Sequence, residues 1–143
     1  MERIALIIGA TGGIGSETAR ALLAAGFRVR ALNRDPERAK KTFAALGAVE
    51  WWQGDALNPS DVVAAAAGAS VVVHAANPPG YKNWRGLALP MLESSIAAAK
   101  AANARLVLPG TVYNFGPNLP VLLDEAAPQE PVTRKGKIRV AME

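Results

Sequence analysis

Short apolar runs alternate with longer helix-forming segments along most of the chain. The apolar runs are rich in β-branched residues, which favours buried strands, and the longer segments are rich in good helix formers. The predicted strands are Ile4–Ile8, Phe27–Leu32, Val49–Trp52, Ser70–His74 and Arg105–Leu108. The predicted helices are Gly13–Ala25, Asp35 to about Leu46, Pro59–Gly68, Trp84–Asn103 with an irregularity at Pro90, and Lys135–Glu143.

This repeated alternation predicts βαβ units and a parallel sheet. Right-handed crossovers then give an α/β, doubly wound, Rossmann-like fold with five strands in the order 3-2-1-4-5 and helices on both faces. We expect one domain over residues 1–143, because no repeat and no second domain pattern is present. The segment after Pro109 is loop-rich until the last predicted helix.

Composition narrows the function classes. Half of the 143 residues are hydrophobic, which suffices for a buried core, and the formal net charge is +4. The basic residues are dispersed and not interleaved with aromatics, so we expect no nucleic-acid partner. The absence of cysteine excludes thiolate chemistry and fits a cytoplasmic location. No apolar run reaches the roughly 18 residues of a membrane span, and no residues show metal-ligand spacing, so neither a membrane nor a metal is expected.

Residues 8–16 read IGATGGIGS, where the first predicted strand turns into the first helix. Helix N-terminal N–H groups and the helix dipole favour a bound phosphate there. Gly9 allows the tight turn, Gly12 lets a pyrophosphate approach the backbone, and Gly15 lets the helix lie close to the sheet. The pattern predicts a dinucleotide site, against the alternative of a tight turn without a ligand. Its predicted cofactor-binding residues in this turn are Gly9, Thr11, Gly12, Gly13, Ile14 and Gly15.

The glycine spacing in GATGGIG resembles that of the short-chain dehydrogenase/reductase superfamily, especially its extended and atypical branches, the NAD-dependent epimerase/dehydratase-like proteins. Three later segments are similar to the same family and follow in its order. Gly54–Leu57 resembles its G-D-x-x segment, His74–Ala76 resembles its H-x-A-A segment, and Thr111–Gly116 resembles its T-V-Y-x-x-G stretch.

The resemblance implies roles for the first two of these segments. Asp55, with Ala56 beside it, would hydrogen-bond the amino group of the adenine. The segment of Ala75, Ala76 and Asn77 would pass under the adenine ribose. The cofactor expected from the family is NADP or NAD.

The end of the second predicted strand bears on the choice between NADP and NAD. An acidic residue there would bind the ribose 2′-hydroxyl of NAD, but this position holds Asn33, followed by Arg34. A guanidinium suits a phosphate, and the N-R-D-P sequence resembles the atypical branch, in which this arginine meets the 2′-phosphate. We therefore favour NADP, with Asp35 as a helix cap. The alternative is that Arg34 is a solvated loop charge.

The usual catalytic residues of the family are not in their places. The family uses Tyr-x-x-x-Lys on a helix, in which the lysine lowers the tyrosine pKa. Here Lys135 and Arg139 occupy those two positions, and Thr111 is the hydroxyl nearest to the usual serine position. One hypothesis is that Tyr113 or Tyr81 supplies a proton, with Thr111 orienting the substrate and Lys135 or Arg139 holding the cofactor ribose or an anion. The other is NADP binding without this chemistry.

The loop after the fourth predicted strand offers the substrate contacts. Tyr81 and Trp84 lie in or directly after it, at the sheet edge where the resemblance places the nicotinamide and substrate. The alternative for Trp84 is an anchor of the loop. His74 is interpreted as a packed residue.

The resemblance implies an oxidoreductase that transfers hydride on a nucleotide sugar or another small carbonyl or alcohol. The rival hypothesis is a non-catalytic NADP-binding regulator or sensor with a degenerate active site. Relatives in the extended branch are about twice as long, so we expect a truncated relative or a fragment that lacks their C-terminal substrate-binding portion. A homodimer through helices would follow the family.

Overall fold

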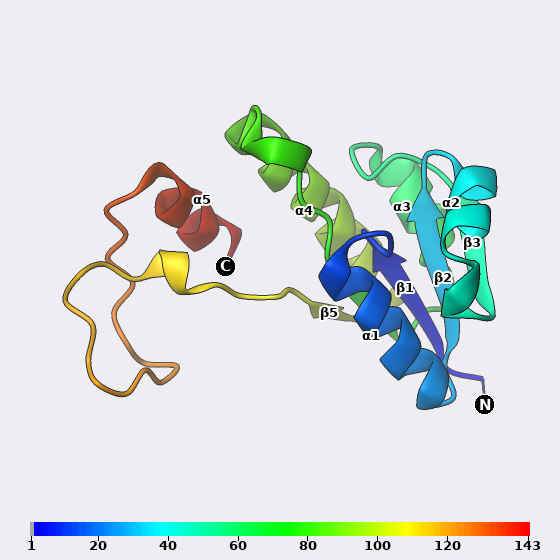
Figure 1. Cartoon of the computed structure of the whole chain (residues 1–143), viewed down its shortest axis with the longest axis horizontal. Helices are drawn as coiled ribbons and strands as arrows, with labels where there is room; N and C mark the ends of the chain where they lie inside the picture. The colour runs from blue at the N-terminus through cyan, green and yellow to red at the C-terminus, as the bar shows by residue number, and fades with distance from the viewer. Residues whose placement is uncertain (1) are drawn as a thin grey trace. The chain divides into compact units, whose positions relative to one another are not determined.

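The computed structural model describes residues 2–143, with only the backbone of Tyr81. Its strands are β1 (Ile4–Ile8), β2 (Arg28–Asn33), β3 (Val49–Gln53), β4 (Val71–His74) and β5 (Arg105–Val107). They pair in parallel in the order β3-β2-β1-β4-β5, which confirms the predicted fold class and topology (Figure 1). The helices are α1 (Gly13–Ala24), α2 (Pro36–Thr42), α3 (Pro59–Ala65), α4 (Trp84–Ala102) and α5 (Arg134–Met142), with 3₁₀ turns η1 (Ala44–Leu46), η2 (Pro79–Tyr81) and η3 (Val112–Asn114).

The chain forms two compact units. The first ends at Leu108 and holds the whole sheet with α1 to α4, and the second, Pro109–Glu143, holds η3 and α5. No helix of the described residues is both long and apolar enough to cross a bilayer.

The sheet of the first unit is buried on both faces. Ile7 of β1 aligns with Ala31 of β2 and Val73 of β4, and this row packs toward α1. The neighbouring residue Leu6 belongs to the opposite core, which packs against α3 and α4. Because side chains alternate along a strand, each strand contributes to both layers. Residues at the carboxyl edge of the sheet are therefore held by packing on two sides.

Arg30 is a charged side chain in the buried middle of β2, 8% exposed. Its Nη1 donates to the carbonyl oxygens of Ala65, at 3.1 Å, and Ala67, at 2.7 Å, and its Nε lies 3.7 Å from a carboxylate oxygen of Glu50. The last carbonyls of a helix lack intrahelical partners and favour a cation. Arg30 thus satisfies the end of α3, which stops at Ala65 rather than at the predicted Gly68.

The second predicted helix is shorter than expected. α2 ends at Thr42, and η1 follows, so the prediction of one helix reaching Leu46 is wrong. Phe43 leaves the helical conformation, with φ −111° and ψ 29°, and its ring lies 6.3 Å from that of Trp51 on β3. The contact between Phe43 and Trp51 thus lies at the point where α2 ends. By contrast, α4 runs through Pro90 as a single helix.

Candidate cofactor-binding site

The glycine turn between β1 and α1 is packed too closely for larger residues. Gly9 has φ +91°, in the left-handed region that favours glycine. A Cβ there would lie 2.6 Å from the backbone of Ala75 and Ala76. A Cβ on Gly15 would overlap the carbonyl oxygen of Gly9, whereas one on Gly13 would meet nothing within 4 Å. Gly9 and Gly15 thus let the loop after β4 and helix α1 approach the same turn.

The N-terminus of α1 is open to an anion. Gly12 is its N-cap, no side chain caps it, and its first turn carries no acidic residue. The backbone N–H groups and the helix dipole at such an end favour negative charge. A hollow of about 390 Å³ lies in front of it. The lining residues are Gly9, Thr11, Gly12, Gly13, Ile14, Ala75, Ala76 and Asn77.

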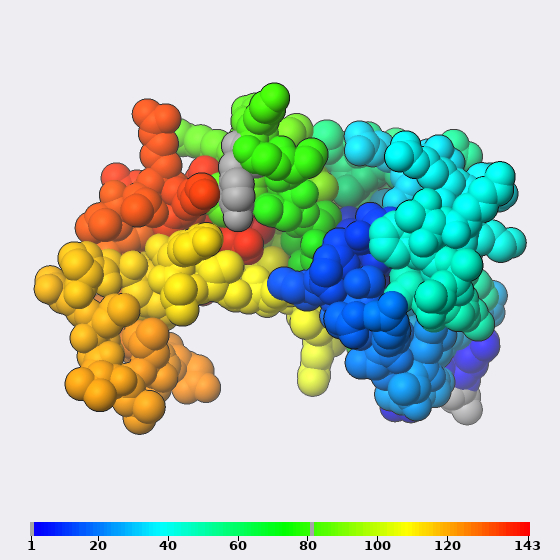
Figure 2. Space-filling model, viewed as in Figure 1, coloured from blue at the N-terminus to red at the C-terminus, as the bar shows by residue number. Residues whose placement is uncertain are grey.

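A second hollow, of about 270 Å³, adjoins the first and shares Gly9, Ala76 and Asn77 with it. It extends toward β2 and β3, where Asn33, Arg34, Asp55 and Ala56 line it, and is bounded by Leu87 and Met91 of α4. The space-filling view shows the blue turn of α1 beside green α4 (Figure 2). Together the hollows form an elongated site at the carboxyl ends of β1, β2 and β4, where doubly wound sheets bind ligands.

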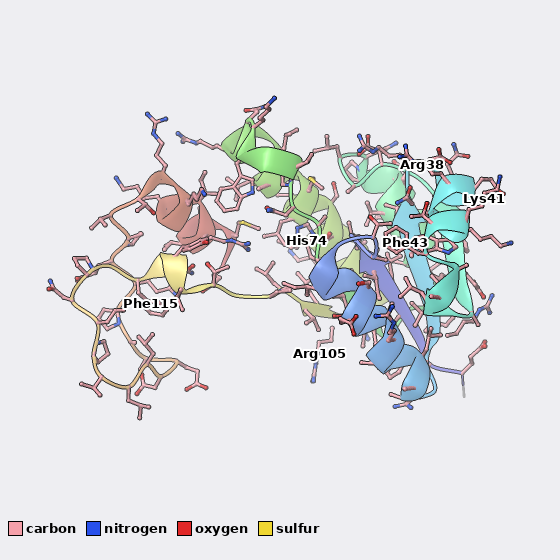
Figure 3. The ribbon with its side chains drawn as sticks, in the orientation of Figure 1. Arg38, Lys41, Phe43, His74, Arg105 and Phe115 are labelled. Carbon is pink, nitrogen blue, oxygen red and sulfur yellow. The ribbon has the colours of Figure 1, made fainter. Side chains whose placement is uncertain are left out.

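The end of β2 is ordered by two successive backbone contacts. The side-chain oxygen of Asn33 accepts from the N–H of Asp35 at 2.8 Å. The carboxylate of Asp35 accepts from the N–H of Arg38 at 3.0 Å and caps α2, as predicted. Arg34 is exposed and lines the second hollow. Arg38 and Lys41 extend from α2 (Figure 3). The carboxylate of Asp35, which follows directly after Arg34, is therefore used to cap α2.

Asp55 is held by its neighbours at the end of β3. Its carboxylate accepts from the N–H of Leu57 at 2.9 Å, and its own N–H donates to Asp61 at 2.9 Å. Its side chain is half-buried. Asp55 can thus present carboxylate oxygen to a ligand from a fixed position.

His74 lies at the end of β4 (Figure 3). It is buried, 2% exposed, and its Nδ1 lies 2.8 Å from the hydroxyl of Ser95. That hydroxyl donates its one hydrogen to the carbonyl of Met91 at 3.2 Å, so Nδ1 of His74 carries the proton toward it. The interpretation of His74 as a packed residue is confirmed.

The structure supports the anchoring alternative for Trp84. Its side chain is only 4% exposed, and its indole N–H donates to the side-chain oxygen of Asn77 at 2.6 Å. Nothing in the sequence pattern indicated this contact. The side chain of Tyr81, the other predicted substrate contact, lies outside the described residues.

The residues predicted at the catalytic positions, apart from the alternative donor Tyr81, lie in the second unit. The hydroxyl of Thr111 accepts from the N–H of Tyr113 at 3.3 Å, and the ring of Tyr113 is exposed. Lys135 and Arg139 stand one turn apart on α5. A Cβ on Gly136 would overlap the carbonyl oxygen of Tyr113, so this glycine lets α5 lie against η3. The fold of this unit therefore brings Tyr113 near the helical turn that carries Lys135.

Asn114 is a residue that sequence reasoning missed. It is buried, and its amide donates to the side chain of Gln129 at 3.2 Å, which in turn donates to Glu143 at 2.9 Å. These contacts join η3 to the end of α5 within the second unit. Among the residues that the structure describes, no group of three or more His, Cys, Asp or Glu could hold a metal ion.

Comparisons with known proteins agree with this geometry. Residues 9–131 match the family described as NAD(P)H-binding. A candidate epimerase from Burkholderia cenocepacia is 25% identical, with a TM-score of 0.80 over 98% of this chain and 48% of its own. UDP-glucose 4-epimerase from Bifidobacterium longum, solved with NAD+ and UDP, is 16% identical, with a TM-score of 0.78 over 97% and 46%.

A short-chain dehydrogenase/reductase superfamily protein from Agrobacterium tumefaciens, solved with bound NAD, is 20% identical, with a TM-score of 0.75 over 98% of this chain and 43% of its own. The chain thus spans just under half the length of these solved structures. No curated protein sequence matches it. The family match, the strand order and the glycine turn agree: the chain belongs to the NAD(P)H-binding family.

Proposed function

We propose that this protein binds NADP(H) in preference to NAD(H) and is an epimerase/dehydratase-like oxidoreductase. Its substrate would be a sugar or another small carbonyl or alcohol. The observation that carries the proposal is the uncapped N-terminus of α1, which opens onto an elongated site at the carboxyl edge of the sheet. The Bifidobacterium epimerase, solved with NAD+ and UDP, supports a nucleotide sugar as one substrate class.

In this proposal the dinucleotide occupies both hollows, and different site residues contact its different parts. The turn from Gly9 to Gly15 holds the pyrophosphate through backbone N–H groups. Asp55 and Ala56 contact the adenine, and the segment of Ala75, Ala76 and Asn77 lies along the ribose. The bound nicotinamide supplies hydride transfer, and the protein fixes its position.

The preference for NADP rests on the end of β2. Asn33 offers no carboxylate to a ribose 2′-hydroxyl, and its side-chain oxygen is already used by Asp35. Arg34 is exposed at the rim of the second hollow, where a guanidinium can form two parallel hydrogen bonds with a phosphate. A 2′-phosphate on the adenine ribose would therefore gain a charged partner that a 2′-hydroxyl would not need.

For proton transfer we propose Tyr113, with Thr111 orienting the substrate oxygen. Lys135 and Arg139 would supply positive charge to the cofactor ribose or to an anionic substrate. The contact between Gly136 and the carbonyl of Tyr113 supports this grouping, because it holds the tyrosine beside the basic turn of α5. A phenolic hydroxyl can donate a proton to a substrate oxygen or accept one from it, which is the role proposed for Tyr113.

The test is a screen of sugars, nucleotide sugars and simple carbonyls that follows both NADPH oxidation and conversion of the substrate, because an epimerase or dehydratase regenerates its cofactor in each cycle. Turnover of any of them supports the oxidoreductase. NADPH binding without turnover would instead support the rival, a non-catalytic NADP-binding regulator. That rival rests on Lys135 and Arg139 standing where relatives carry tyrosine and lysine, and the comparisons do not favour it.

A further inference from the structure

The contact between Trp84 and Asn77 joins the start of α4 to the loop that lines both hollows. The indole Nε1 lies 2.6 Å from the side-chain oxygen of Asn77, and the ring of Trp84 is 4% exposed. Asn77 itself is exposed and is one of the three residues shared by the two hollows. A buried side chain thus holds an exposed one at the centre of the site.

The contact also fixes which end of the amide is which. An indole N–H is a donor only, so the amide atom that meets it must be the oxygen. The two hydrogens of Asn77 then remain on the nitrogen of the same amide. Rotation of the amide would set two donors against each other, and this cost keeps the orientation.

The backbone on either side of this contact is tightly packed, so the loop that carries Asn77 has a fixed position. Ala76 precedes Asn77, and a Cβ on Gly9 would lie 2.6 Å from the nitrogen of Ala76. At the other end of the loop, Asn83 adopts a left-handed conformation with φ 46°. A Cβ on Gly86 would lie 2.5 Å from the side-chain oxygen of Asn83. The loop is therefore held at both ends, and Trp84 ties those ends together.

We infer that Trp84 is a positioning residue, which orients Asn77 so that its amide donates hydrogen bonds to an oxygen of the bound dinucleotide. The inference rests on the proposed dinucleotide binding and deepens it. Oxygens of a ribose or a phosphate accept such bonds, and Asn77 lines both of the hollows in which the proposed function places these groups. Trp84 acts through Asn77 and need not touch the ligand.

The test is NADPH binding by calorimetry to the full chain and five variants. Trp84→Phe keeps the ring and removes only the donor, so we expect NADPH affinity to fall about fivefold. Asn77→Asp keeps an oxygen for the indole but replaces the donors with an acceptor, so we expect a loss of roughly tenfold or more. Trp52→Phe, the matched control on β3, leaves affinity unchanged.

A double variant separates positioning from general damage. Trp84→Phe added to Asn77→Ala should cost no further NADPH affinity beyond that of Asn77→Ala, because the amide that Trp84 would orient is already absent. Wild-type affinity in Trp84→Phe, or a full additional loss in the double variant, overturns the inference alone. Absence of NADPH and NADH binding to the wild-type chain overturns the proposed function together with it.

Discussion

The two compact units of the chain differ in how far they match the pattern of the family that the sequence resembles. In residues 2–108 the features that would bind a dinucleotide belong largely to the backbone: a glycine turn, an uncapped helix end and the edge of a parallel sheet. In residues 109–143 the backbone again forms a helix beside a tyrosine-bearing turn, but the sequence resemblance predicts Lys135 and Arg139 at the positions of the usual tyrosine and lysine. Backbone-based binding tolerates wide changes of side chain, whereas acid–base chemistry depends on individual pKa values.

The sharpest way to test that contrast is to remove the phenolic hydroxyl from the second unit. Once a substrate is found, Tyr113→Phe should lower kcat by roughly 100-fold or more, because a general acid is lost. NADPH affinity should stay unchanged, since Tyr113 is assigned to proton transfer and not to cofactor binding. Tyr81→Phe is the parallel variant for the alternative donor. Steady-state kinetics that show full activity in both variants would refute the assignment of a tyrosine as proton donor.

A methyl group on the glycine turn tests the first unit. Gly15→Ala places a Cβ against the carbonyl oxygen of Gly9, and that backbone atom has little room to move. We expect the free energy of unfolding to fall by about 1–3 kcal/mol, with weaker NADPH binding. Gly13→Ala is the matched control, because its Cβ meets nothing within 4 Å. Chemical denaturation measures the free energy of unfolding of the two variants. Equal stability of Gly15→Ala and Gly13→Ala would mean that Gly15 does not provide close helix packing.

The ion pair between Arg28 of β2 and Glu50 of β3 gives the smallest effect. Hydrogen bonding to the Arg28 guanidinium lowers the pKa of Glu50 below its usual value. A depressed pKa stabilises the fold above the unfolded-state value of about 4.3, and this contribution is lost as the pH falls through the folded-state value. We expect Glu50→Gln to cost less than about 1 kcal/mol at pH 7, with the difference shrinking below about pH 4. The control is Glu93→Gln, on the exposed surface of α4. Thermal melts across this pH range would contradict the account if the gap between Glu50→Gln and wild type widened in acid.

Much of the fold could be predicted because its signals are local. The apolar run Ile4–Ile8 and the glycines after it specify a strand and a turn by themselves, and alternation then fixes the sheet order. The early end of α2 could not be predicted, because it accompanies a contact between Phe43 and Trp51 that brings two layers together. The burial of Arg30 likewise depends on where α3 ends in space.

The site shows the same division. The predicted residues of the glycine turn, together with Arg34 and Asp55, were marked by their place in the chain, and all of them but Gly15 line the two adjoining hollows. Asn114 and the contact between Trp84 and Asn77 carried no such mark. The buried amide of Asn114 and the buried indole of Trp84 meet their partners only when separate segments of the chain fold together. Neither residue type indicates its partner from the sequence alone.

The most direct test of the central claim is calorimetry of NADPH and NADH binding to the wild-type chain and to Arg34→Ala. Lys41→Ala, which removes an exposed cation from the last turn of α2, serves as the charge control. The account predicts NADPH binding that weakens about tenfold or more in Arg34→Ala, with NADH affinity little changed and Lys41→Ala like wild type. Equal loss for both cofactors, or no loss of NADPH affinity, would contradict the assignment of Arg34 to a 2′-phosphate. Failure of the wild-type chain to bind either cofactor would contradict the claim as a whole.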